Sequence, residues 1–192
     1  KPEAQHETWI KSVLIDTAEW GEYLVSGTEL PERLAVDVPE QRATIRPWGA
    51  LFAPEADVSA DLPAALVFTA PPGTPLRAPS DAAWVASAVD RAAYALRATG
   101  VAVAVVTDGR WWAVVSADAT RSTASGIVDA TLWREEDLLR DAFLSLINAR
   151  RLIAGPDEQR LPALFERSLL QQEEVTEALG TQVRRAVELL VQ

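Results

Sequence analysis

The chain has 192 residues, of which 48% are hydrophobic and 24% are charged. This balance is typical of a folded globular domain and excludes a disordered or collagen-like chain. The chain has no cysteine and one histidine, His6, which excludes disulfides, thiolate chemistry and any site that needs two histidines. No apolar run approaches the roughly 18 residues of a membrane span, and no segment resembles a signal peptide. We therefore expect a cytoplasmic protein with no membrane partner.

The charge is negative and unevenly distributed. Eighteen basic and 28 acidic side chains give a formal net charge of -10, and residues 1–62 hold five of the bases and twelve of the acids. The only lysines are Lys1 and Lys11, so every other base is an arginine. A negative total argues against tight, non-specific DNA binding by the whole surface. Because the chain starts at Lys1 and contains no methionine, we expect it to be part of a longer protein.

The N-terminal third predicts one helix and two strands. Apolar residues at helical spacing predict a helix over residues 6–20, with Gly21 as its C-terminal stop. Residues 44–53 and 64–70 are expected to be strands. Pro47 predicts that the first of them is an edge strand or a bulged strand.

The middle of the chain predicts a strand–helix–strand unit. Ser80 and Asp81 are expected to cap a helix that ends at Gly100. Residues 101–106 carry β-branched side chains at alternate positions and predict a buried central strand. Such a unit is a crossover connection between parallel strands.

The segment Asp108-Gly109 predicts a tight hairpin turn after this strand. Trp111 and Trp112 begin the returning strand and should face opposite sides of the sheet. A purely structural interpretation explains both tryptophans. A functional interpretation makes Arg110 and one exposed tryptophan a contact surface.

The last third predicts helices. Residues 133–153 have a helical pattern, and a second pattern runs from about 161 to 190 with only Gly180 interrupting it. The second pattern is longer than a usual globular helix, which predicts a connector or a helical hairpin. We therefore divide the chain into an α/β domain over residues 1–130 and a helical connector over 131–192.

Two further candidates have simpler structural explanations. His6 could belong to a catalytic pair, but a lone histidine on an N-terminal helix is more often a surface residue. Glu135, Glu136 and Asp137 could bind a divalent cation, but acids in the first turn of a helix commonly compensate its dipole. The sequence contains no glycine-rich phosphate loop and no nucleophile elbow.

Two parts of the sequence resemble a known group of proteins. Residues 101–115, with the core Val-Val-Thr-Asp-Gly-Arg-Trp-Trp, resemble the LTNGR-x-W strand–turn–strand of N-terminal nuclease-type domains in restriction-modification proteins. The C-terminal part resembles the connector ahead of the methyltransferase domain in large bacterial adenine methyltransferases, which occur in phage-defence systems of the BREX and DISARM kind. The matching segments are 132–136 (LWREE), 161–168 (LPALFERS) and 172–188 (QEEVTEALGTQVRRAVE).

The resemblance implies a PD-(D/E)xK-like core: a helix, a hairpin of strands, a second helix, and the strand that leads to the Thr-Asp-Gly-Arg turn. In active members a carboxylate on one strand and a D/E-x-K motif on the next hold a divalent cation. The strand in the D/E-x-K position here is residues 65–70, which contain no acid and no lysine. Arginine is a poor replacement for the compact lysine ammonium. We therefore expect a degenerate nuclease-like core, an α/β fold with a small mixed sheet and flanking helices, and no catalytic residues.

The resemblance also implies a parent protein that methylates DNA with S-adenosylmethionine. Adenine methyltransferases of this group carry an Asn-Pro-Pro-Tyr/Phe motif, whereas the only asparagine here, Asn148, is not followed by proline. We therefore expect no cofactor in this chain. The expected partners are a downstream methyltransferase domain of the same parent chain, other defence-system subunits and DNA.

The leading hypothesis is a non-catalytic accessory domain that positions DNA, inhibits the methyltransferase or docks partner proteins. Its expected contact residues are Arg110, Trp111, Trp112, Arg91 and Arg97. A structural interaction module with no role on nucleic acid is a further possibility.

The alternative is an active Mg²⁺-dependent DNA endonuclease with a displaced acidic site. Asp57 and Asp61 are the candidate metal ligands, together with Glu19 or Glu22 from the first helix. The missing lysine argues against this alternative.

Overall fold

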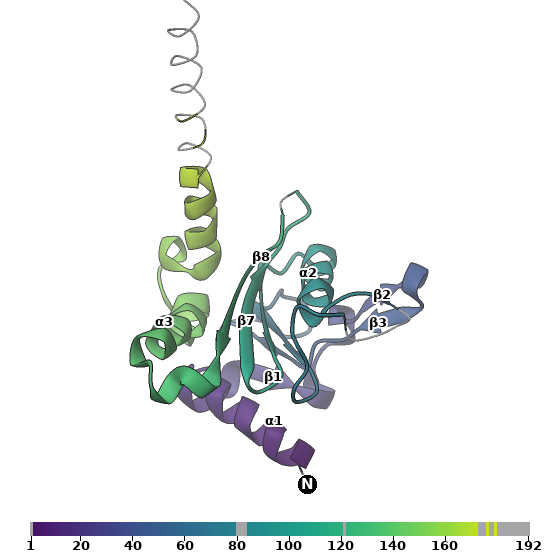
Figure 1. Cartoon of the computed structure of the whole chain (residues 1–192). Coiled ribbons are helices and arrows are strands. Elements are labelled where there is room, and N and C mark those ends of the chain that lie inside the picture. The colour runs from purple at the N-terminus through teal and green to yellow at the C-terminus, as the bar shows by residue number, and fades with distance from the viewer. Residues whose placement is uncertain (1, 80–83, 121, 173–175, 177–178, 180–192) are drawn as a thin grey trace, which may run out of the picture.

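A mixed β-sheet forms the centre of this computed structural model (Figure 1). In the part of the chain that the structure describes (residues 2–79, 84–120, 122–172, 176 and 179), the sheet has six strands in the order β1-β4-β5-β6-β7-β8. These strands are β1 (Leu24–Ser26), β4 (Gly49–Leu51), β5 (Ala65–Thr69), β6 (Val103–Thr107), β7 (Trp111–Ser116) and β8 (Ala124–Asp129). β5 and β6 are parallel, and the other neighbouring pairs are antiparallel.

Helices cover both faces of this sheet, as Figure 1 shows. One face carries α2 (Ala88–Thr99) and a separate ribbon of two strands, β2 (Val36–Val38) and β3 (Ala43–Ile45). The other face carries α1 (Pro2–Ser12), α3 (Asp137–Ile147) and the π-helical turns Val13–Thr17 and Arg150–Ala154. The expected α/β fold, with a small mixed sheet and flanking helices, is confirmed. None of the described helices is both long and apolar enough to cross a membrane.

β6 shows why the sheet needs a layer on each face. Every residue of this strand is buried. Ala104 and Val106 belong to the core beneath α2, whereas Val103 and Val105 belong to the core beneath α1 and α3. The alternation follows from the two-residue period of a strand. The prediction of a buried central strand is confirmed.

α2 connects β5 to β6, as the predicted crossover requires, but it begins later than expected. The prediction of a cap at Ser80 and Asp81, which lie outside the described residues, is wrong because the helix begins at Ala88. Ser87 Oγ accepts a hydrogen bond from the Asp90 backbone N–H at 3.1 Å, and the Ser87 N–H donates to the Asp90 carboxylate at 3.0 Å. This reciprocal capping box satisfies the first turn. The helix ends at Gly100 with φ +78°, as predicted.

Pro47 breaks the strand that was predicted over residues 44–53. β3 ends at Ile45 and pairs with β2, and β4 begins at Gly49 and pairs with β1 and β5. Proline has no backbone N–H to donate, so the chain leaves one sheet and enters the other at this residue. The strand predicted over 64–70 is confirmed as β5.

The first predicted helix starts earlier and ends earlier than expected. α1 begins at Pro2, and the π-helical turn that continues it ends at Thr17. Glu19 has a positive φ of 60°, so the helix stops before Gly21 is reached. Gly21 therefore lies beyond the helix end rather than at it.

The C-terminal third is more broken than its pattern predicted. A 3₁₀ turn (Ala130–Arg134), α3 and the turn Arg150–Ala154 replace one continuous helix. Residues 161–172 form a further helix, named here the C-terminal helix. Gly180 and most of the residues beyond 172 lie outside the described residues, so the helical hairpin stays a prediction. Phe143, Ile147 and Leu161 share one core cluster with α1, so this third packs against the sheet.

Candidate functional site: the Arg110 turn and the surfaces around it

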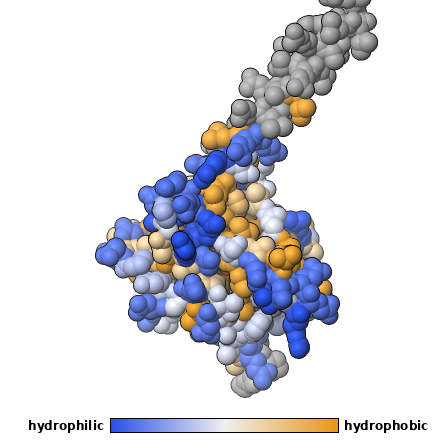
Figure 2. Space-filling view, turned by 90° about the vertical axis from the view of Figure 1, so that its left-hand side faces the viewer, coloured by the Kyte–Doolittle hydropathy of each residue, from blue (hydrophilic) through white to orange (hydrophobic). Residues whose placement is uncertain are grey.

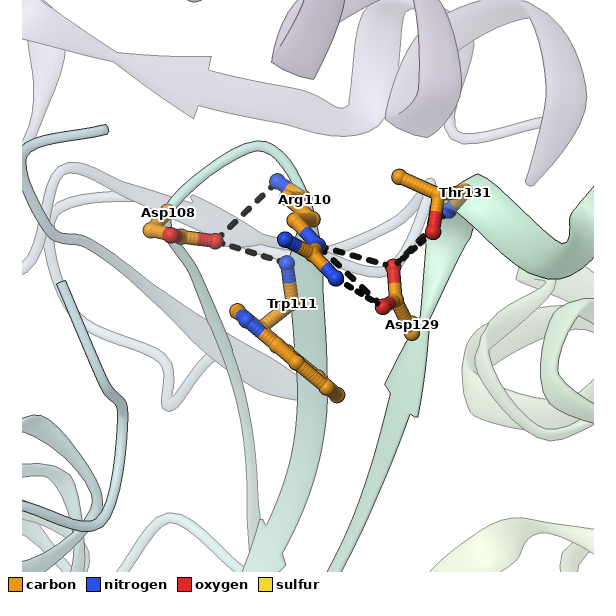
Figure 3. Close-up of polar contacts among 5 residues, drawn as sticks. All are labelled: Asp108, Arg110, Trp111, Asp129 and Thr131. Carbon is orange, nitrogen blue, oxygen red and sulfur yellow. Dashed lines mark hydrogen bonds and ion pairs between the residues drawn. The ribbon is translucent and has the colours of Figure 1, made fainter. Parts of the chain in front are cut away.

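Asp108 organises the turn between β6 and β7. Its Oδ1 accepts hydrogen bonds from the backbone N–H groups of Arg110 and Trp111 at 3.0 and 2.6 Å (Figure 3). Its Oδ2 accepts from the N–H of Gly73 at 3.0 Å, which ties the loop after β5 to the same turn. Gly109 has φ +87°, a conformation that glycine adopts without strain. The predicted Asp-Gly hairpin turn is confirmed.

Arg110 forms an ion pair with Asp129, at the end of the neighbouring strand β8. The guanidinium Nη2 lies 2.6 Å from Asp129 Oδ2, and Nε lies 3.1 Å from both carboxylate oxygens (Figure 3). Thr131 donates to the same carboxylate through its N–H at 2.9 Å and its Oγ1 at 2.7 Å. The hydrogen bond from Arg110, followed by those from Thr131, holds the pKa of Asp129 far below its usual value. Arg110 therefore stabilises the fold, because it forms an ion pair with a nearly buried carboxylate.

Trp111 and Trp112 face opposite sides of the sheet, as predicted. Trp111 is half-buried, and the Arg110 guanidinium lies 5.0 Å from the centre of its ring. Trp112 is fully buried, with its ring centre 6.1 Å from that of Trp133 and 6.3 Å from that of Phe143. The burial removes Trp112 from the expected contact surface.

Two side chains of the first helix, neither of which was predicted to lie there, hydrogen-bond to the same turn. The ring Nε2 of His6 lies 2.7 Å from the backbone oxygen of Asp108, and Trp9 Nε1 donates to the oxygen of Gly109 at 2.7 Å. A Cβ atom on Gly109 would come within 2.6 Å of the His6 ring. The only histidine of the chain therefore joins α1 to the turn.

Arg91 and Arg97 lie at opposite ends of α2. The Arg91 guanidinium is 5.0 Å from the centre of the Trp84 ring, and its Nη2 donates to the Trp84 oxygen at 3.4 Å. Arg97 donates to the backbone oxygen of Asp118 at 2.9 Å and to the Thr123 hydroxyl at 2.8 Å. The connection from β7 to β8 thus engages Arg97, far from the turn that holds Arg110. The three arginines do not form one surface.

The acids of the alternative nuclease hypothesis shape a loop. Asp57 Oδ1 accepts from the N–H and the hydroxyl of Ser59, at 2.8 and 2.7 Å, and these bonds lower the pKa of Asp57. Asp61 accepts from the Asp57 N–H at 2.9 Å. Among the described residues, no three acids or histidines come together as a metal-binding group. Glu19 and Glu22 are therefore not brought to Asp57 and Asp61 as a common ligand set.

The side chains of β5 are almost all apolar and inaccessible. Ala65, Leu66 and Val67 are fully buried, and Phe68 is 7% exposed. Thr69 is the exposed residue of this strand. The strand supplies core to both faces of the sheet and presents no ionisable group.

An apolar groove of about 390 Å³ lies between β8, α3 and the C-terminal helix. Gly126, Leu139, Leu146 and Phe165 are among its lining residues, and a Cβ on Gly126 would meet no atom within 4 Å. Leu146, which lies on α3, is 37% exposed. Figure 2 shows hydrophobic surface running down from the base of the C-terminal helix. This groove was not expected from the sequence, because its walls come from segments that are distant along the chain.

Comparison of the chain with protein family models, with curated proteins and with solved structures gives no match.

Proposed function

We propose that this chain is a non-catalytic, nuclease-like accessory domain of a bacterial DNA adenine methyltransferase from a restriction-modification or phage-defence system. Apart from β1, β2 and β3, which lie between α1 and β4, its element order supports the proposal: α1, the antiparallel pair β4–β5, α2, and then β6, which leads into the Thr-Asp-Gly-Arg turn. This is the order that the resemblance implies. The cofactor S-adenosylmethionine would belong to the methyltransferase domain of the parent chain.

The observation that carries the proposal is the composition and burial of β5. A metal-dependent nuclease needs carboxylates and a lysine beside the scissile phosphate. In this chain the corresponding strand is Ala65–Thr69, which places apolar side chains in the core instead. Strand β5 therefore carries neither the acid nor the lysine that a nuclease of this kind would use.

Docking of a partner protein fits the surface better than DNA binding. The three candidate arginines all make contacts within the fold, and the net charge of -10 opposes approach to a polyanion. The apolar groove beside β8 has the character of a protein-binding site, since it is concave and its lining includes the partly exposed Leu146. The methyltransferase domain of the parent chain is the proposed occupant.

Cleavage and mobility-shift assays test the non-catalytic assignment. Incubation of supercoiled plasmid with the protein and Mg²⁺ or Mn²⁺ is expected to leave the plasmid intact. Cleavage that an Asp61→Ala variant loses would instead establish the displaced acidic site. In a mobility-shift assay at low salt we expect no binding in the micromolar range. If the chain bound DNA in the micromolar range and the Arg110→Ala variant did not, the docking assignment would be overturned.

Two substitutions test the groove. Leucine at position 126 (Gly126→Leu) fills open space without strain, and Leu146→Asp places a charge on an exposed lining residue. Both are expected to weaken binding of the separately expressed methyltransferase domain by at least about tenfold in calorimetry. The control is Val85→Asp, which alters a residue that is 76% exposed and lies away from the groove. If all three variants bound the methyltransferase domain equally well, the groove would not be its binding site.

A further inference from the structure

A second pocket, of about 240 Å³, lies where β5 ends and α2 begins. Its lining includes the guanidinium-bearing side chains Arg46 and Arg91 and the hydroxyl-bearing side chains Thr44, Thr69 and Thr74. No carboxylate occurs among the described residues that line it. In open α/β sheets, ligands commonly bind at the carboxyl ends of parallel strands, which is where this pocket lies relative to β5.

Arg91 is held in a defined orientation on one side of the pocket. Its guanidinium lies over the ring of Trp84 at 5.0 Å, and one of its amino groups donates to the Trp84 oxygen. Because the guanidinium keeps its positive charge in these contacts, it attracts an anion that enters the pocket. Stacking on an aromatic face also limits the side-chain entropy that binding would cost.

Arg46 is held on the other side of the pocket by an exposed ion pair. Its two terminal amino groups donate to Glu32 at 2.5 and 2.8 Å, and this hydrogen bonding lowers the pKa of Glu32. The Arg46 side chain is 54% exposed and that of Glu32 is 81% exposed. Exposed ion pairs contribute little to stability. A ligand that accepts from the same bidentate fork can therefore displace Glu32 at small cost.

The shape of the donors selects the ligand. A tetrahedral oxyanion presents several acceptor oxygens to a planar guanidinium, and Arg–phosphate pairs are frequently bidentate. The Thr44 hydroxyl already donates to Asp37 at 2.7 Å, so Asp37 partly offsets the positive charge near Arg46. The first turn of α2 is occupied by its own capping box, so the two arginines, rather than the helix end, supply the attraction. The volume equals roughly eight water molecules at ~30 Å³ each, which is enough for a phosphate group and the atoms next to it.

We propose that the pocket between β5, β3 and α2 binds a phosphate group through Arg46 and Arg91, with Glu32 as the intramolecular partner that the phosphate displaces. The site is separate from the groove beside β8 and does not depend on the docking role. The phosphate can belong to a small phosphorylated molecule or to a nucleic-acid backbone, and both offer the same oxyanion to the two arginines.

Calorimetric titration of the whole chain with inorganic phosphate at low ionic strength tests the proposal. We expect saturable binding that Arg46→Gln and Arg91→Gln each weaken by at least about tenfold. Glu32→Gln, which frees Arg46, should tighten binding about two- to fivefold, the range expected from an exposed ion pair. Arg134→Gln is the matched control, because it removes one exposed positive charge elsewhere and should leave the titration unchanged.

Two results would overturn the proposal. One is a lack of saturable phosphate binding by both the unaltered chain and Glu32→Gln. The other is equal weakening by Arg134→Gln and Arg46→Gln, which would indicate attraction by general charge. Because Arg46 is exposed, Arg46→Gln keeps the test valid even if Arg91→Gln fails to fold. Parallel titrations with a nucleoside monophosphate and a short oligothymidylate distinguish the two sources of the phosphate.

Discussion

Two arginine–carboxylate pairs in this molecule have similar geometry and different surroundings. Arg110 pairs with Asp129, whose side chain is 10% exposed and also accepts two hydrogen bonds from Thr131. Arg46 pairs with Glu32, whose side chain is 81% exposed. Loss of a partner inside the first pair leaves a nearly buried charge, whereas water replaces a lost partner in the second. The burial of the acid therefore decides whether an arginine maintains the fold or remains available to a ligand.

The largest effect is expected from the core that supports the first pair. Trp112→Ala should lower the free energy of unfolding by about 4 kcal/mol, because it removes a fully buried ring packed against Trp133 and Phe143. Trp111→Ala should cost less than half as much, since Trp111 is half-buried. Urea denaturation of both variants measures the difference. Equal losses would mean that the two faces of β7 are not packed as described.

A smaller loss is expected from Asp129→Asn, which keeps the shape of the side chain and removes its charge. This variant should be less stable by about 2 kcal/mol at neutral pH, since it removes a nearly buried, charge-assisted interaction. For a chain of this length that corresponds to a fall in Tm of about 4–8 °C.

The effect of Asp129→Asn should also depend on pH. The folded-state pKa of Asp129 is depressed, so its contribution to stability is complete above the unfolded value near ~3.9 and is lost as the pH falls toward the folded value. The difference between the unaltered chain and the variant should therefore be constant above about pH 5 and shrink below about pH 4. Thermal unfolding across this range measures it. A difference that grows on acidification would contradict the assigned ion pair.

A loss of similar or smaller size is expected at the turn itself. Gly109→Ala should destabilise the chain by about 2 kcal/mol, because alanine is strained at φ +87° and its Cβ displaces the His6 ring. Gly73→Ala is the matched control: its φ is +83° and its Cβ would meet no atom within 4 Å, so only the conformational cost of about 1 kcal/mol remains. In a His6→Ala background the two substitutions should cost the same. If Gly109→Ala still cost more than Gly73→Ala in this background, the added Cβ atom would clash with a group other than the His6 ring.

The sequence predicted the features of the fold that depend on neighbouring residues. β6 follows from its β-branched pattern, the hairpin turn follows from Asp108-Gly109, and the end of α2 follows from Gly100. The start of α2 was misplaced because the sequence has a serine and an acid at two places in this region, and it is Ser87 with Asp90 that forms the capping box of the helix. Local signals therefore predicted the elements better than their boundaries.

The candidate sites depended on contacts that a linear pattern does not contain. Arg110 was singled out correctly as part of a distinctive turn, but its partner Asp129 lies 19 residues away on the next strand. Arg46 was not considered, because its pocket is formed only when β3 lies beside α2. The type of each side chain is known from the sequence, whereas its partner and its burial depend on the folded structure.

One measurement tests the contrast between the two pairs directly: the Tm of Glu32→Gln and of Asp129→Asn, each with and without inorganic phosphate. Both substitutions replace a carboxylate with the amide of the same length. We predict that Glu32→Gln leaves the ligand-free Tm unchanged and enlarges the phosphate-induced rise, because ligand binding stabilises the folded state by mass action. Asp129→Asn should lower the ligand-free Tm and leave the rise as it is in the unaltered chain. The reverse pattern, with stability lost at Glu32 and the phosphate response altered at Asp129, would contradict the account.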